Sequence, residues 1–91
     1  MKYPKSIITD DMGVCFRCGT YRNVECHHLM NAANRKNSTK YGLVIGLCSK
    51  CHREVHASGM LMNAYKRTAQ IKFEEKYSHD KWMEVFNKNY L

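Results

Sequence analysis

The sequence predicts a small α+β domain that needs stabilisation beyond its hydrophobic core. Its 91 residues make one domain at most, because a chain of this length buries a modest share of its surface. Five of these residues are Cys, and small domains often use a metal or disulfides to supplement the core. A β-branched run in the first half and helical periodicity in the second half give the expected α+β order.

The first half of the chain is expected to form two short strands. Residues 23–30 (NVECHHLM) suit one strand, and residues 43–47 (LVIGL) are a β-branched run that suits a buried one. Between them, residues 31–41 are polar and basic with little hydrophobic periodicity, which predicts a loop. The first dozen residues are expected to form an arm or a further short strand.

The second half is expected to be helical. Ser49 suits the N-cap of a helix over residues 50–57 that Gly59 closes, and Ser78 suits the N-cap of a last short helix. Between them a longer helix is expected over residues 61–77, with one apolar stripe that packs against the rest of the domain. The stripe consists of Leu61, Tyr65, Ala69, Phe73 and Tyr77.

Two Cys-x-x-Cys pairs are the strongest sign of chemistry in the sequence. They are Cys15–Cys18 and Cys48–Cys51. Tetrahedral zinc takes four such ligands at about 2.3 Å. The first pair lies on a turn and the second at the start of a predicted helix, whose N-terminus favours thiolates. We therefore expect one structural Zn²⁺ in a treble-clef arrangement, with disulfides or free thiols as the alternative.

The fifth cysteine, Cys26, is expected to be a small buried hydrophobe on the strand, with an alternative role as a zinc ligand. The sequence shows no export signal and no apolar run long enough to cross a membrane. We therefore expect a cytoplasmic protein, where thiols hold metal more often than they form disulfides. The expected organisation is a single domain over residues 1–91, with the zinc finger over 1–59 and a helical extension over 60–91.

Four of the five histidines are interleaved with the cysteine pairs. His27 and His28 form a doublet, and His52 and His56 lie one turn apart on the same helix face, a spacing used to chelate a divalent cation. The alternative is that these side chains are structural or solvated, which is our interpretation of His79.

Positive charge is concentrated in the middle of the chain. The net charge is +7, and residues 35–67 contribute +6 of it, from seven basic residues and one acidic residue. Such a distribution favours binding to a polyanion. The expected phosphate contacts are Arg35, Lys36, Lys40 and Arg53.

Together the Cys and His motifs resemble the HNH endonucleases of the ββα-metal, or His-Me finger, group. The resemblance is carried by Cys15-x-x-Cys18, by His27-His28 and by LCSKCHREVH over residues 47–56. The longer segment HHLMNAANRKNSTKYGLVIGLCSKCHREVH and the ending FNKNYL are similar to small phage and prophage HNH proteins. The resemblance implies a phage or prophage protein in a bacterial host that cuts DNA as a monomer or homodimer.

The resemblance also implies a role for each histidine of the quartet. His28 would be the general base that takes a proton from the attacking water. His27, His52 and His56 would hold one catalytic Mg²⁺, Mn²⁺, Ni²⁺ or Zn²⁺ ion, and cleavage would leave 5′-phosphate and 3′-hydroxyl ends. Because neighbouring residues on a regular strand face opposite ways, His27 and His28 can serve one site only if the strand ends or distorts there.

The middle Asn of the family pattern is where this sequence departs from it. The usual position falls near Gly42 and Leu43, and no Asn stands there. Asn34 and Asn37 are the substitutes, and we favour Asn34, which would hold the loop and orient His28 through backbone hydrogen bonds. Two non-catalytic functions stay open, a zinc-binding DNA-binding module and a zinc finger that binds protein.

Overall fold

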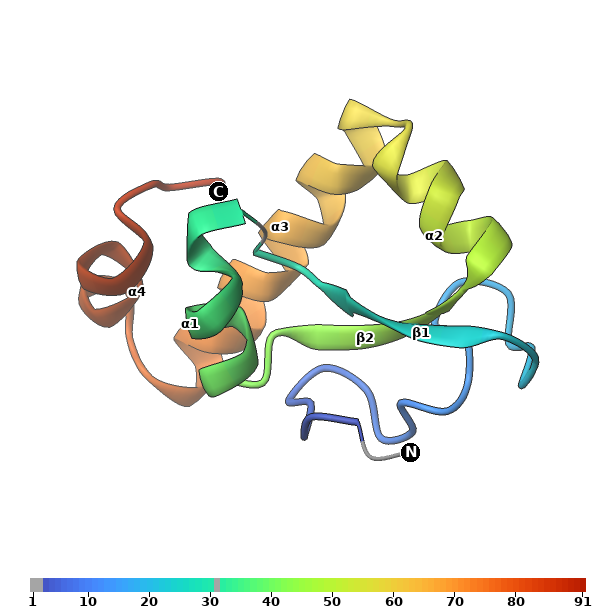
Figure 1. Ribbon diagram of the computed structural model, residues 1–91. Helices are drawn as coiled ribbons and strands as arrows, with labels where there is room; N and C mark the ends of the chain where they lie inside the picture. Colours follow the sequence, from blue (N-terminus) through green and yellow to red (C-terminus); the bar gives the residue numbers. More distant parts are fainter. Residues whose placement is uncertain (1–2, 31) are drawn as a thin grey trace.

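The two strands lie at the centre of the fold in a computed structural model that describes residues 3–30 and 32–91 (Figure 1). Strands β1 (Val24–His28) and β2 (Val44–Cys48) pair antiparallel, with His28 opposite Val44 and Val24 opposite Cys48. The N-terminal segment passes along one side of this sheet, and helices α2 and α3 lie on the other side. The predicted α+β class is therefore confirmed. In the described residues one α-helix lies between the two strands in sequence and three follow them.

Strand β2 is buried at all five positions, because the N-terminal segment covers one side of it and the helices cover the other (Figure 1). Phe16 N donates to Gly46 O at 2.7 Å, which ties the segment around Cys15 to the strand. A Cβ atom at Gly46 would collide with the carbonyl oxygens of Met12 and Val14. Glycine is therefore required here for close backbone approach.

The prediction of a loop over residues 31–41 is wrong for residues 32–40, whereas Asn31 lies outside the described residues. A 3₁₀ turn, η1 (Ala32–Asn34), runs into helix α1 (Arg35–Lys40). Asn34 occupies the N-cap position but makes no side-chain capping bond. The helix is held instead by Ser38, whose buried hydroxyl donates to Leu43 O at 2.6 Å and accepts from Met30 N at 3.2 Å. A helix anchored by one buried hydroxyl carries no apolar periodicity for sequence analysis to detect.

Helix α2 (Ser49–His56) begins directly after β2, and its N-cap is Cys48, not the predicted Ser49. The sulfur of Cys48 accepts from Cys51 N at 3.5 Å. Gly59 does not end this helix; it is the first residue of α3 (Gly59–Lys76), which Ser58 caps by accepting from Leu61 N.

Helices α3 and α4 (His79–Phe86) complete the core. Ser78 caps α4 as predicted, accepting from Lys81 N at 3.0 Å. Phe73 of α3 and Trp82 of α4 are fully buried, with ring centroids 5.4 Å apart. Of the predicted stripe on α3, Ala69 and Phe73 are buried in the core. Its other members are half-buried (Leu61, Tyr65) or exposed (Tyr77).

The C-terminal tail is held by a buried polar side chain. Gln70 Nε2 donates to Asn89 and Glu74, both at 2.7 Å, and its Oε1 accepts from Tyr90 N at 2.7 Å. Trp82 Nε1 donates to Lys88 O at 2.7 Å. These bonds satisfy the buried polar atoms of both side chains and fix the tail against α3 and α4.

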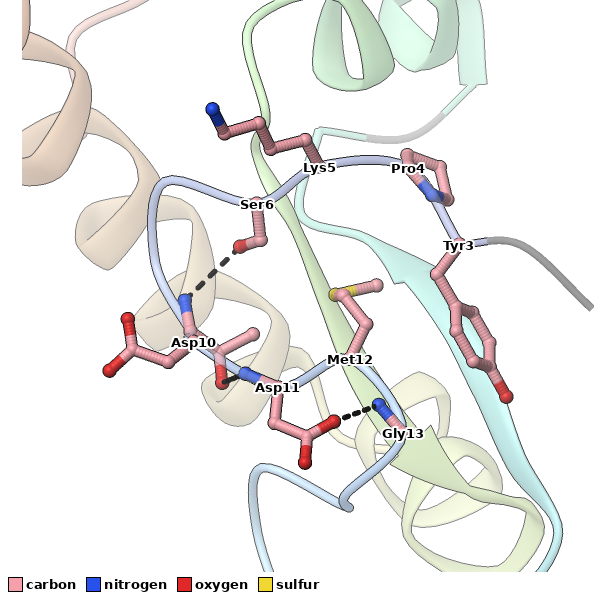
Figure 2. Close-up of a pocket in the computed structure, with 9 residues that line it drawn as sticks. Tyr3, Pro4, Lys5, Ser6, Asp10, Asp11, Met12 and Gly13 are labelled. Atoms are coloured by element: carbon pink, nitrogen blue, oxygen red, sulfur yellow. Dashed lines mark hydrogen bonds between the residues drawn. The ribbon is translucent and has the colours of Figure 1, made fainter.

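The N-terminal arm folds back on itself along one side of the sheet (Figure 1) and lines an open hollow of about 540 Å³ (Figure 2). Ser6 Oγ accepts from Ile8 N and Thr9 N, and Asp11 Oδ1 accepts from Gly13 N, within local turns. Ser6 Oγ also donates to Val44 O at 2.6 Å and Tyr3 Oη donates to Val24 O at 2.9 Å, which ties the arm to both strands. Among the described residues, no helix is long and apolar enough to cross a membrane.

Candidate metal centres and active site

The four cysteines of the two Cys-x-x-Cys pairs meet in space. The sulfurs of Cys15, Cys18, Cys48 and Cys51 all lie within 4.8 Å of one another. Cys18 Sγ and Cys48 Sγ are 3.8 Å apart, which is the separation of about 3.8 Å that a tetrahedral zinc with bonds of about 2.3 Å imposes. The cluster thus has the ligand type, number and spacing of a structural zinc site.

The surroundings of the cluster act differently on its individual thiols. Burial alone would raise the pKa of the Cys15 thiol, but hydrogen bonds from backbone groups of Cys48, Cys18 and Arg17 lower it to about 6. Burial and the neighbouring thiols raise the pKa of Cys51 to about 12. Four adjacent thiolates repel one another, and a divalent cation removes that repulsion.

Three histidines form a second cluster next to the first. The ligating ring nitrogens of His27, His52 and His56 lie within 4.8 Å of one another. His52 Nε2 and His56 Nε2 are 3.1 Å apart, close to the roughly 3.0–3.4 Å between two nitrogens that bind one ion at about 2.1 Å. The helix spacing and the position of β1 against α2 together produce this convergence.

His27 is the clearest candidate ligand because it is buried without partners. Its exposed fraction is 2%, and neither Nδ1 nor Nε2 has a hydrogen-bond partner within the described part of the chain. Burial and the charges of His52, His56 and His28 lower its pKa to about 4, so that the ring is neutral at pH 7. Unsatisfied buried nitrogens are costly, and a bound cation would satisfy one of them.

A carboxylate supports the second cluster from outside. Glu25 Oε1 lies 2.8 Å from His52 Nδ1, and Glu25 Oε2 accepts from the Ser49 hydroxyl at 3.2 Å. These contacts, His52 first, lower the pKa of the Glu25 carboxyl. A carboxylate on the outer nitrogen of a histidine leaves its Nε2 free for an ion.

His28 ends β1 and lies beside the histidine cluster. Cys26, His27, His28, Arg35, His52 and His56 line one open cleft of about 210 Å³. Both members of the doublet therefore border the same cleft, at the point where the strand ends. His28 Nε2 is 2.9 Å from the hydroxyl of Thr39 on α1. Burial, and then the charges of Arg35 and His52, lower the pKa of His28.

The remaining predicted site residues are more dispersed. Arg35 borders the cleft, whereas Lys36, Lys40 and Arg53 are exposed, on α1 and α2. Asn34 is half-buried at the start of α1, and its predicted role in orienting His28 stays a prediction. Cys26 is half-buried on the cleft wall, outside the group of four cysteines.

Sequence analysis missed two residues of this site, Glu25 and Thr39. Both act on a histidine that is distant in sequence, 27 positions away for Glu25 and 11 for Thr39. Glu25 does stand two residues before His27, on the same side of an alternating strand, which is the one signal that could have indicated it.

Comparisons with protein-family models, with curated proteins and with solved structures found no match to this chain. What can be said of its function therefore rests on the two clusters and the cleft.

Proposed function

We propose that this protein is a metal-dependent DNA endonuclease of the HNH type, with a treble-clef zinc at the four cysteines. The observation that carries the proposal is the second cluster: three imidazoles converge beside a fourth, and the most buried of them has no partner for either ring nitrogen. A domain that used zinc only to fold would need the cysteines alone. The histidine quartet requires a second purpose.

The second site fits one divalent cation. His27, His52 and His56 would hold it, leaving the remaining coordination positions for water and a phosphate oxygen. Such a cation would stabilise negative charge on the phosphoryl group and on the departing oxygen. Three imidazoles suit Ni²⁺ or Zn²⁺ better than Mg²⁺ or Mn²⁺, which prefer oxygen ligands.

His28 is the proposed general base for hydrolysis. Its imidazole takes a proton from a water molecule, and the water oxygen forms a bond to phosphorus. The bond from phosphorus to the 3′-oxygen breaks, and that oxygen leaves with the electron pair and is protonated by solvent. The products are a 5′-phosphate and a 3′-hydroxyl.

Positive side chains around the cleft are the proposed DNA contacts. Arg35 borders the cleft and would bind a phosphate next to the scissile one. Lys36, Lys40 and Arg53, which are exposed on α1 and α2, would bind further phosphates. Contacts of this kind neutralise phosphates with little preference for sequence.

The test is cleavage of a supercoiled plasmid by the zinc-loaded chain in a series of Mg²⁺, Mn²⁺, Ni²⁺ and Zn²⁺. We expect nicking or linearisation with at least one of these ions, and no cleavage by the zinc-loaded chain when no further ion is added. His56→Ala should lower the cleavage rate at limiting metal, because a missing ligand first reduces the occupancy of the metal site. Excess metal should restore part of that rate.

A chain that cleaves no duplex, single-stranded or branched DNA with any of these ions would overturn the proposal. Salt-sensitive DNA binding without cleavage would then identify the protein as a zinc-binding DNA-binding module.

A further inference from the structure

We propose that Thr39 is a positioning residue for His28, and that its hydroxyl fixes the tautomer in which Nε2 carries the proton and Nδ1 is the basic nitrogen. The catalytic consequence rests on the proposed function, whereas the tautomer itself can be measured whether or not the protein is a nuclease. The role is separate from that expected of Asn34, which would act through the backbone.

The direction of the contact between Thr39 and His28 depends on which acceptor takes the hydroxyl proton of Thr39. The hydroxyl has one proton, and its oxygen lies 3.3 Å from Arg35 O and 2.9 Å from His28 Nε2. We assign this proton to Arg35 O, which can only accept, because helical Thr side chains commonly make this bond. The hydroxyl oxygen is then free to accept from His28, which places a proton on Nε2.

The remaining ring nitrogen of His28, Nδ1, then carries the lone pair. When Nδ1 takes a proton, the ring becomes an imidazolium whose Nε2–H still donates to Thr39, and that bond is strengthened by the charge. Thr39 therefore supports both the starting tautomer and the charged product. This is the arrangement of a base that a third group orients.

Thr39 is held in place by its neighbour in sequence. Ser38 is fully buried and bridges Met30 N, just after β1, to Leu43 O, just before β2. Because β1 ends at His28, the same anchor fixes both α1 and the end of the strand that carries the base. The distance between Thr39 and His28 is thus set by the fold and not by a free side chain.

The direct test of the tautomer is long-range ¹H–¹⁵N correlation spectroscopy of the zinc-loaded full chain at pH 8, above the ordinary imidazole pKa of about 6.5. The His28 signals are assigned by their loss in His28→Ala. We expect the Nε2–H tautomer in the wild type and in Thr39→Ser, and a mixture of tautomers in Thr39→Val. An Nδ1–H tautomer in the wild type would overturn the proposal, even if the protein cleaves DNA.

The kinetic test uses the same variants with the plasmid. Thr39→Val should lower kcat by about threefold to tenfold, the range that one ordinary hydrogen bond supplies, with KM unchanged. Thr39→Ser should restore the rate. The matched control is Thr68→Val, which removes a similar helical bond, to Ala64 O at 3.1 Å, on a residue that does not line the histidine cleft, and should leave kcat unchanged. Equal kcat in wild type and Thr39→Val would contradict the role in catalysis.

Discussion

A carboxylate oxygen of Glu25 lies 2.8 Å from Nδ1 of His52, on the side of the ring that faces away from the histidine cluster. The two residues come from β1 and α2, so this contact ties the strand that carries the doublet to the helix that carries the other two imidazoles. It orients His52 and would make its Nε2 a better ligand for the proposed cation.

Glu25→Gln should therefore lower the affinity of the proposed second metal site by about tenfold to a hundredfold while leaving the proposed zinc at the cysteines in place. Titration calorimetry with Ni²⁺ on the zinc-loaded chain measures the effect. The matched control is Glu74→Gln. Glu74 on α3 also lies 2.8 Å from a histidine nitrogen, Nδ1 of His79 on α4, but this pair is outside the histidine cluster. Equal Ni²⁺ affinities in the two variants would mean that Glu25 does not support the site.

Removal of the structural zinc should unfold the domain, because a small core with four adjacent thiols depends on the ion. Circular dichroism during titration with a strong chelator should show loss of helix, reversed by added Zn²⁺. Cys26→Ser should keep one tightly bound zinc per chain, whereas Cys48→Ser should lose it. Purified protein that contains no zinc and still shows the full helical signal would refute the assignment.

The close approach at Gly46 predicts a large cost for an added methyl group. Gly46→Ala should lower the free energy of unfolding by about 3 kcal/mol, because backbone carbonyl oxygens obstruct the new Cβ and cannot yield cheaply. Gly59→Ala is the control: nothing lies within 4 Å of its Cβ position at the start of α3, and the change should raise stability by up to about 1 kcal/mol. Urea unfolding with excess Zn²⁺ gives both values, and equal midpoints would contradict the described crossing of the N-terminal segment over β2.

DNA affinity should depend on the positive residues at the start of α1. Replacement of Arg35 and Lys36 by Ala should weaken binding and reduce the slope of log affinity against log salt by about one per lost contact. Replacement of Lys72 and Lys81, on α3 and α4, is the charge-matched control and should change the slope little. If the Arg35 and Lys36 variant keeps the wild-type slope, the DNA lies elsewhere, and the Lys66 and Arg67 segment of α3 becomes the next candidate.

Sequence spacing was sufficient to predict which cysteines and histidines come together. Pairs three or four residues apart on a turn or helix start have little choice of direction, so Cys48 with Cys51, and His52 with His56, could be placed before any fold was known. The strands were predictable for a related reason, since β-branched runs such as residues 43–47 favour extended backbone.

The predictions from sequence were wrong or incomplete where a single polar side chain, and not an apolar pattern, determines the local structure. Helix α1 is fixed by the buried hydroxyl of Ser38, which sequence analysis could not distinguish from the many exposed serines of loops. The start of α2 was placed one residue late because a cysteine sulfur acts as the cap in place of Ser49. Thr39 could not be found at all, because its contact with His28 depends on how α1 packs against the end of β1.

The most direct test of the central claim compares His28→Ala with His79→Ala in the plasmid assay, at saturating metal and DNA. His28→Ala should lower kcat by about a hundredfold to ten-thousandfold, the usual contribution of a general base, with zinc content, Ni²⁺ affinity and DNA affinity unchanged. His79→Ala, which removes an exposed histidine of α4, should cleave like the wild type. If His28→Ala cleaves with the kcat of the wild type, the assignment of the base is wrong and the role belongs to another group in the cleft.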